Sequence, residues 1–258
     1  MKMRKFFIAM LLLITTSPLF ANDEFTAKEF ITQSKDTLRY RELLPKNYDE
    51  TAKYPLVLFL HGSGERGSDN RSQMTHGANM FTNPVNREKY PAIVLFPQCP
   101  NGKFWSFDKI PVDWNFEDLL NTEIATPLRG VKELLDKYIA TGNVDVKRIY
   151  IIGLSMGGMG TFDMICRYPD IFAAAIPICG GAYTEHLKET IGKVKIRIFH
   201  GDNDNLVPVE NSRACYKALE KYGEAPEYKE FVGCGHDSWT PAFNQPDFFS
   251  WLFAQKKK

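Results

Sequence analysis

Apolar residues follow two alternating patterns along this chain. Five short apolar runs end at or next to Gly, Pro or His, which is typical of strands buried on both faces of a parallel sheet. They cover residues 56–60, 92–96, 149–152, 173–178 and 196–199. Residues 25–44 alternate more weakly, so we expect a two-stranded antiparallel start to the sheet that ends at Pro45.

Amphipathic stretches with helical spacing lie between these runs. One opens at Thr126 and Pro127 and continues to about residue 140, where Gly142 is a plausible stop. A second covers about 156–167, and a third covers about 247–254. This alternation predicts an α/β fold: a mostly parallel central sheet with helices on both faces and functional groups at the carboxyl ends of the strands.

The two ends of the chain differ from its middle. Three basic residues precede an apolar run over 6–14, and a short polar stretch ends at Ala21. This predicts a signal peptide over residues 1–21, hence a periplasmic or secreted protein. The alternative, a permanent membrane anchor, needs an apolar run about twice as long. No repeat or linker interrupts residues 22–255, so we expect one catalytic domain over 22–258.

Charge and cysteine usage exclude several partners. The chain has 32 Lys and Arg against 31 Asp and Glu, and this near-neutral balance is not that of a nucleic-acid-binding protein. Its five cysteines show no C-x-x-C spacing, so neither a metal nor another cofactor is expected. Two alternatives remain open for Cys179 and Cys234: a disulfide that tethers the following loop, or two free, buried thiols.

The motif that carries chemistry is Gly153-Leu154-Ser155-Met156-Gly157. It has the form G-x-S-x-G, follows a predicted strand and opens a predicted helix. Glycines allow the sharp strand-to-helix turn that exposes a serine hydroxyl. We therefore expect Ser155 to be a nucleophile, the alternative being a surface serine in a tight turn.

A serine nucleophile needs a base and an acid, and both have candidates after later strands. His236 lies in a Gly-rich turn and is the best placed of the five histidines. Asp202 and Asp204 both follow the strand at 196–199. Asp202 is expected to accept N–H groups within its own turn, and Asp204 lies further over the strand ends. We assign Asp204 to the triad.

A developing oxyanion needs backbone donors. The Gly-rich loop that begins at His61 follows the strand at 56–60, and it can aim the N–H of Ser63 into the site. The N–H of Met156, next to the nucleophile, is the second expected donor. His61 itself and His200 end strands, and we expect both to satisfy backbone groups rather than transfer protons.

With these motifs the sequence resembles the α/β-hydrolase family. More narrowly, it resembles exported single-domain bacterial serine esterases, which are often labelled predicted peptidases. These esterases are related to feruloyl and acetyl esterases and to phospholipase/carboxylesterase enzymes. The resemblance rests on the sequences at residues 61–67, 97–100, 153–158, 200–208 and 235–239. It implies ester hydrolysis with Ser155 as nucleophile, Asp204 as acid and His236 as base. One departure is that His61 is followed by Gly-Ser-Gly, without the uninterrupted Gly run of some lipases.

The spacing also predicts the kind of substrate. About fifteen residues separate the strands at 173–178 and 196–199, too few for a helical lid domain, so we expect no large lid and an open site. Trp105 and Trp239, with Trp114 nearby, could bind a sugar or an aromatic acyl group, the alternative being buried packing residues. The leading hypothesis is a serine carboxylesterase acting on short-acyl or hydroxycinnamoyl esters of carbohydrate. The alternatives are a serine peptidase of prolyl-oligopeptidase-like ancestry and a non-catalytic binding protein.

Overall fold

One twisted sheet of eight strands organises the computed structural model of this chain, which describes residues 24–107, 115–116 and 121–258. The predicted signal peptide and Trp114 lie outside the described residues. The strands are β1 (Thr26–Ile31), β2 (Thr37–Leu43), β3 (Tyr54–Leu60), β4 (Ile93–Pro97), β5 (Val144–Leu154), β6 (Ala174–Ile178), β7 (Lys195–Gly201) and β8 (Glu227–Phe231).

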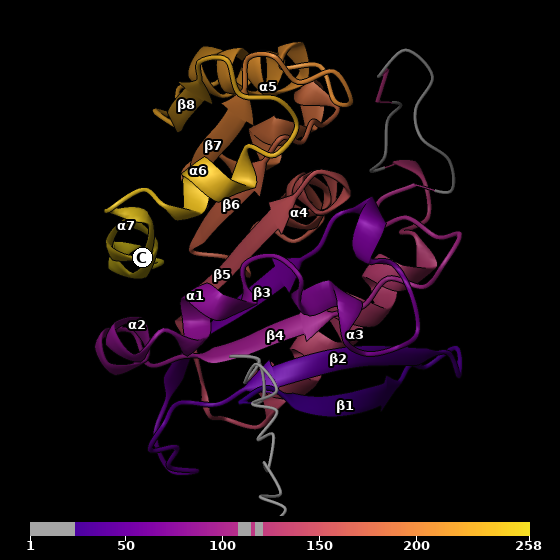
Figure 1. The fold of residues 1–258 in the computed structure, drawn as a ribbon, viewed down its shortest axis with the longest axis vertical. Coiled ribbons are helices and arrows are strands. Elements are labelled where there is room, and N and C mark those ends of the chain that lie inside the picture. The colour runs from indigo at the N-terminus through magenta and orange to yellow at the C-terminus, as the bar shows by residue number, and fades with distance from the viewer. Residues whose placement is uncertain (1–23, 108–114, 117–120) are drawn as a thin grey trace, which may run out of the picture.

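The strand order is β1-β2-β4-β3-β5-β6-β7-β8. Strand β2 is antiparallel to both β1 and β4, and every other neighbouring pair is parallel. Figure 1 shows β1 and β2 at one edge of the sheet and β8 at the other. The α/β prediction, including the antiparallel start, is confirmed.

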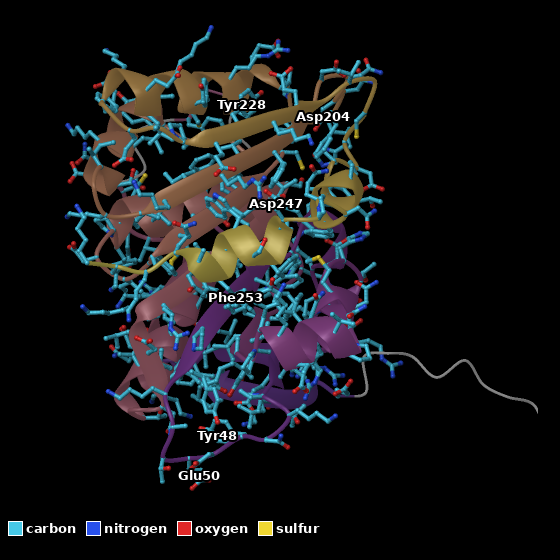
Figure 2. All side chains as sticks on the ribbon, turned by 90° about the vertical axis from the view of Figure 1, so that its left-hand side faces the viewer. Tyr48, Glu50, Asp204, Tyr228, Asp247 and Phe253 are labelled. Atoms are coloured by element: carbon cyan, nitrogen blue, oxygen red, sulfur yellow. The ribbon has the colours of Figure 1, made fainter. Side chains whose placement is uncertain are left out.

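Helices cover both faces of the sheet. Alternate residues of the central strands point to opposite sides and are apolar, so both faces must be buried. The α-helices are α1 (Ala78–Thr82), α2 (Pro84–Lys89), α3 (Thr126–Ala140), α4 (Met156–Arg167), α5 (Glu210–Lys221), α6 (Trp239–Phe243) and α7 (Phe248–Ala254). Apolar residues of α3, α4 and α5 form one core layer with the sheet. Those of α1, α6 and α7 form the other layer. Figure 2 shows α7 from its side, between Asp247 and Phe253.

Three short 3-10 helices complete the described elements: η1 (Ser63–Glu65), η2 (Ser72–Met74) and η5 (Thr184–Thr190). The connection between β6 and β7 holds only η5, so no large lid covers the site from this connection, as expected. No helix in the described part of the chain has the length and apolarity needed to cross a bilayer.

The cysteines settle one of the open alternatives. All five are free, and four of them are buried. Cys234, the exception, is only partly buried on the loop after β8. The hypothesis of a bond between Cys179 and Cys234 is therefore wrong; both thiols are free, as the alternative states, but only Cys179 is buried.

Candidate active site

The turn from β5 into α4 presents Ser155. Its backbone adopts φ 53° and ψ −119°, a left-handed φ that non-glycine residues rarely take. The N–H of Ser155 donates to the carbonyl of Ile178 at 2.9 Å, and its own carbonyl accepts from Met159 N–H at 3.1 Å. These bonds from β6 and from the first turn of α4 hold the strained turn in place.

The two glycines of the motif are required by close backbone contacts. A Cβ on Gly153 would lie 2.1 Å from the carbonyl oxygen of Gly157. A Cβ on Gly157 would in turn lie 2.0 Å from the carbonyl oxygen of Leu60 on β3. Neither position can therefore carry a side chain without moving backbone, which explains the G-x-S-x-G pattern physically.

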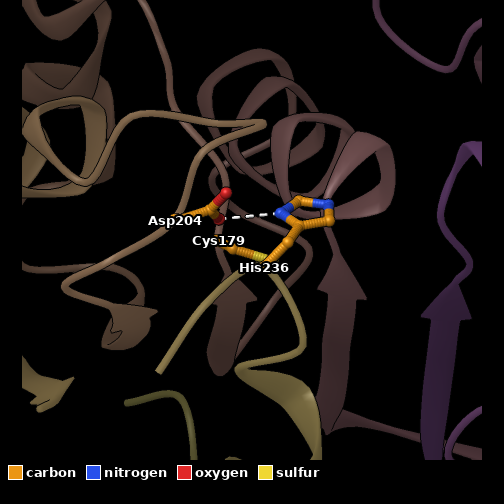
Figure 3. A group of neighbouring side chains, drawn as sticks. All are labelled: Cys179, Asp204 and His236. Atoms are coloured by element: carbon orange, nitrogen blue, oxygen red, sulfur yellow. Dashed lines mark hydrogen bonds and ion pairs between the residues drawn. The ribbon is translucent and has the colours of Figure 1, made fainter. Parts of the chain in front are cut away.

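The structure brings Ser155, His236 and Asp204 together from three separate loops. The Nε2 atom of His236 lies 2.9 Å from Ser155 Oγ, and Nδ1 lies 2.7 Å from Asp204 Oδ2. Figure 3 shows the latter contact. Because a carboxylate can only accept, Nδ1 carries the proton, and Nε2 is left as the acceptor for the Ser155 hydroxyl. This is the arrangement that activates a serine for attack.

Asp204 is fully buried and accepts four hydrogen bonds. Its Oδ1 accepts the N–H groups of Leu206 at 2.8 Å and Val207 at 2.9 Å, while Oδ2 faces two histidines. Burial acts to raise the pKa of this carboxyl, but the hydrogen bonds outweigh burial and hold the pKa well below its usual range. Asp204 therefore stays ionised at neutral pH.

Asp202 has a different task from the one expected. Its Oδ1 accepts the N–H of Gly233 at 2.7 Å, so it bonds across to the loop that carries His236 rather than within its own turn. Asn203 N–H and the carbonyl of Cys234 form a second link between the same two loops at 3.0 Å. The expected role in loop structure holds, but the partner lies on another loop, which only the packing of β7 beside β8 could decide.

His200 at the end of β7 is part of the site that sequence reasoning only partly recognised. Its Nε2 lies 3.0 Å from the carbonyl of Val207, as expected for a histidine satisfying backbone, but also 3.2 Å from Asp204 Oδ2. Its Nδ1 lies 2.7 Å from Ser212 Oγ on α5. The ring is fully buried, so it helps to hold Asp204 in place from the side opposite to solvent.

The loop after β3 lies against Ser155. A Cβ on Gly62 would lie 3.6 Å from Ser155 Cβ. The N–H groups of Ser63 and Met156, the expected oxyanion donors, belong to the first residues of η1 and α4. First-turn N–H groups have no acceptor within their own helix, as an oxyanion donor requires.

His61 anchors that loop, as expected for a structural histidine. It is buried, its Nε2 accepts Cys99 N–H at 2.9 Å, and Nδ1 donates to the carbonyl of Gly62 at 2.6 Å. Burial lowers the pKa of the ring to about 4, so His61 stays neutral.

The expected contact between Trp105 and substrate is wrong. Its side chain has no exposed surface, and it lies against α4, where a Cβ on Gly160 would come within 2.8 Å of it. Its Nε1 donates to the carbonyl of His61 at 3.0 Å. This hydrogen bond attaches Trp105 to the loop after β3, and α4 packs against the Trp105 side chain.

Trp239, at the start of α6, lies next to the base. Its ring is 5.3 Å from the ring of His236, at an interplanar angle of 88°. It is also 5.1 Å from the ring of His76, whose Nε2 lies 3.6 Å from Glu65 Oε1. The sequence analysis placed Trp239 near the site but gave no role there to Glu65, in the motif at 61–67, or to His76, which was expected to be solvated.

Cys179, Asp204 and His236 each offer one metal-ligating atom, and these atoms lie within 4.8 Å of one another (Figure 3). However, the 2.7 Å between Asp204 Oδ2 and His236 Nδ1 is shorter than the roughly 3.3 Å between two ligand atoms of tetrahedral zinc. Burial also raises the pKa of the Cys179 thiol to about 12, which disfavours the thiolate that binds metals. The geometry fits a hydrogen-bonded acid–base pair better than a preformed metal centre.

Comparison with known proteins supports this picture. A solved structure described as a thermostable esterase superposes with a TM-score of 0.83 at 38% identity, covering 92% of this chain and 64% of that one. A ferulic acid esterase from Anaeromyces mucronatus, solved in complex with ferulic acid, has a TM-score of 0.66 at 17% identity, covering 90% of each chain. The latter likeness establishes the α/β-hydrolase fold alone.

Two curated relatives extend the comparison. A probable carboxylesterase, SOBER1-like, from Arabidopsis thaliana is 26% identical, covering 89% of this chain and 87% of the relative. An uncharacterized secreted protein from Arthroderma benhamiae is 27% identical over 82% of this chain, which spans only 24% of that protein. The phospholipase/carboxylesterase family model matches residues 47–247, which include the whole Ser155, Asp204 and His236 constellation. This chain therefore belongs to the phospholipase/carboxylesterase family.

Proposed function

We propose that this protein is a serine carboxylesterase that hydrolyses carboxylic esters through an acyl-enzyme, with Ser155, His236 and Asp204 as its catalytic triad. The observation that carries the proposal is the continuous hydrogen-bonded chain from Ser155 Oγ through His236 to the buried carboxylate of Asp204. Family membership supports the same reaction class. Membership of a carboxylesterase family favours the esterase over the serine peptidase alternative, and the hydrogen-bonded triad argues against a non-catalytic protein.

In the first half of the reaction, Ser155 Oγ attacks the ester carbonyl carbon while its proton passes to His236 Nε2. The imidazolium that forms is stabilised by the ionised Asp204. The carbonyl oxygen becomes an oxyanion, for which we assign the N–H groups of Ser63 and Met156 as donors. His236 then gives its proton to the alcohol oxygen as the C–O bond breaks, leaving the acyl group on Ser155.

In the second half, His236 takes a proton from water as that water attacks the acyl carbonyl carbon. Collapse of the second tetrahedral intermediate breaks the bond to Ser155 Oγ and returns the proton to the serine. The products are a carboxylic acid and the regenerated enzyme. The proton transfers between Ser155 and His236 use atoms that already lie within hydrogen-bond distance of one another.

For substrate we propose short-acyl or hydroxycinnamoyl esters of carbohydrate. The short β6–β7 connection supports an open site that admits a bulky alcohol, because its only helical element is η5. The ferulic acid complex of the Anaeromyces mucronatus enzyme is consistent with a hydroxycinnamoyl group.

We also propose that residues 1–21 are a signal peptide cleaved after about Ala21, and that the mature domain, residues 22–258, acts in the periplasm or outside the cell. The basic start and the apolar run at 6–14 support export. The Arthroderma benhamiae relative is described as secreted, which is consistent with this. Mass spectrometry of protein from cell fractions tests it: an exported chain that begins near residue 22 is expected, and full-length chain confined to the cytoplasm contradicts it.

The experiment that tests the proposed reaction is Ser155→Ala. The variant is expected to fold normally and to lose at least about three decades of esterase rate on 4-nitrophenyl acetate, because only binding and oxyanion stabilisation remain. A fluorophosphonate probe is expected to label wild type and not the variant. Near-native turnover by the variant, or no labelling of folded wild type, contradicts the proposal.

A further inference from the structure

A second group of polar and aromatic side chains adjoins the catalytic base. The ring of Trp239 packs edge-on against the ring of His236. The ring of His76 lies 5.1 Å from that of Trp239. His76 Nε2 in turn approaches Glu65 Oε1 at 3.6 Å. The segment from η1 to the start of α1 and helix α6, which are distant from one another in sequence, thus converge beside His236.

Glu65 also lies next to the nucleophile. A Cβ built on Gly62 would come within 3.1 Å of Glu65 Oε2 and within 3.6 Å of Ser155 Cβ. The carboxylate and the nucleophile therefore flank the same glycine. The group formed by Glu65, His76 and Trp239, which we call the polar-aromatic group, borders the place where a substrate must lie.

The Glu65 carboxylate has unused capacity to accept hydrogen bonds. Its side chain is only 13% exposed, yet among the described residues its nearest charged partner, His76, stands at 3.6 Å, beyond hydrogen-bond distance. The buried carboxylate of Asp204, by contrast, accepts four hydrogen bonds. The carboxylate therefore has lone pairs left to accept hydroxyl groups from a ligand.

The reaction determines which part of the substrate meets this group. His236 must pass its proton to the alcohol oxygen, so the alcohol lies against the residues around the imidazole. Trp239 offers that alcohol an apolar aromatic surface, and Glu65 offers it an acceptor of hydrogen bonds. An alcohol with a C–H face and several hydroxyl groups matches both, whereas an anionic alcohol would be repelled by the carboxylate.

We propose that Glu65, His76 and Trp239 form a subsite for the sugar that carries the ester, with sugar hydroxyls donating to the Glu65 carboxylate and one sugar face packed on Trp239. His76, in the turn between η2 and α1, holds the carboxylate by its ion pair at 3.6 Å. This proposal rests on the esterase function above and adds the residues that select its alcohol.

The test compares two substrates that share one acyl group, an acetylated xylo-oligosaccharide and ethyl acetate, in wild type, Glu65→Gln, Trp239→Phe and Trp251→Phe. The readout is the ratio of kcat/KM for the sugar ester to kcat/KM for the ethyl ester. We expect this ratio to fall about tenfold in Glu65→Gln, mainly through KM, because the sugar hydroxyls then donate to a neutral acceptor in place of a charged one. Trp239→Phe should lower it several-fold, and Trp251→Phe, on α7, is the matched control whose ratio should equal that of wild type.

Each outcome decides the proposal. An unchanged ratio in both Glu65→Gln and Trp239→Phe overturns it, as does an equal loss on both substrates, which would indicate a general role in the fold or in catalysis. Should Glu65→Gln not fold, the Trp239→Phe ratio alone decides. Failure of the esterase function itself is seen separately, as absence of ethyl acetate hydrolysis by wild type.

Discussion

Replacing Asp204 by asparagine is expected to leave the fold intact and to reduce turnover by about four decades. The carboxylate now faces four donors: two backbone N–H groups at Oδ1 and the two rings of His236 and His200 at Oδ2. An asparagine can keep the backbone pair on its oxygen only by turning its NH2 group toward the rings. A second donor then opposes His236 Nδ1–H.

His236 can relieve that clash by moving its proton to Nε2. Nδ1 then accepts from the amide, but Nε2 can no longer accept the Ser155 proton, and the imidazolium also loses its counter-charge. The same exchange in a serine protease triad lowers kcat by about 10⁴, equivalent to roughly 5–6 kcal/mol of transition-state stabilisation. We expect a loss of that size here.

Asp202→Asn is the matched control, two residues away on the same loop. Its single hydrogen bond, to Gly233 N–H, can be kept by the amide oxygen. We therefore expect activity within a few-fold of wild type and a stability loss of at most about 1 kcal/mol. The assay is kcat/KM on 4-nitrophenyl acetate at neutral pH, with thermal unfolding of both variants. Equal losses in the two variants, or the larger loss in Asp202→Asn, would refute the assignment.

Three further predictions concern substrate, pH and redox state. The open site should favour acetyl or butyryl over palmitoyl 4-nitrophenyl esters, and faster turnover of the palmitoyl ester would contradict this. Burial raises the pKa of Asp163 to about 6 despite its bond to Arg167, so the folded state binds its proton more tightly than the unfolded state, and this group destabilises the protein as pH rises from about 4 to 6. The difference in unfolding free energy, Asp163→Asn minus wild type, should accordingly rise by roughly 2–3 kcal/mol from pH 4 to pH 6 in urea titrations. A difference independent of pH would refute the sign. Unreduced, denatured protein should take up five alkyl groups per chain in mass spectrometry, and fewer than five would indicate a disulfide.

Local patterns were sufficient to predict the sheet, the strand-to-helix turn and the place of Ser155 in that turn. Runs such as 56–60 and 149–152 lie within β3 and β5, and the helix expected over 156–167 is α4. These features depend on residues close together in sequence: the period of apolar positions sets the element, and the glycines around Ser155 permit its turn. Helices α1, α2, α5 and α6 were not predicted. The first two and α6 are only five or six residues long, too short for a clear helical period.

The tertiary structure decided the contacts between segments that are distant in sequence. Trp105 and Trp239 both follow strand ends, yet α4 packs over the first and leaves the second beside His236. Asp202 reaches Gly233, and Glu65 lies near Trp239, only because parallel strands bring their carboxyl ends to one edge of the sheet. Sequence can name the residues that stand at that edge. Which side chain is buried, which accepts a proton and which meets substrate depends on how the helices and loops above it pack, and that is a property of the whole fold.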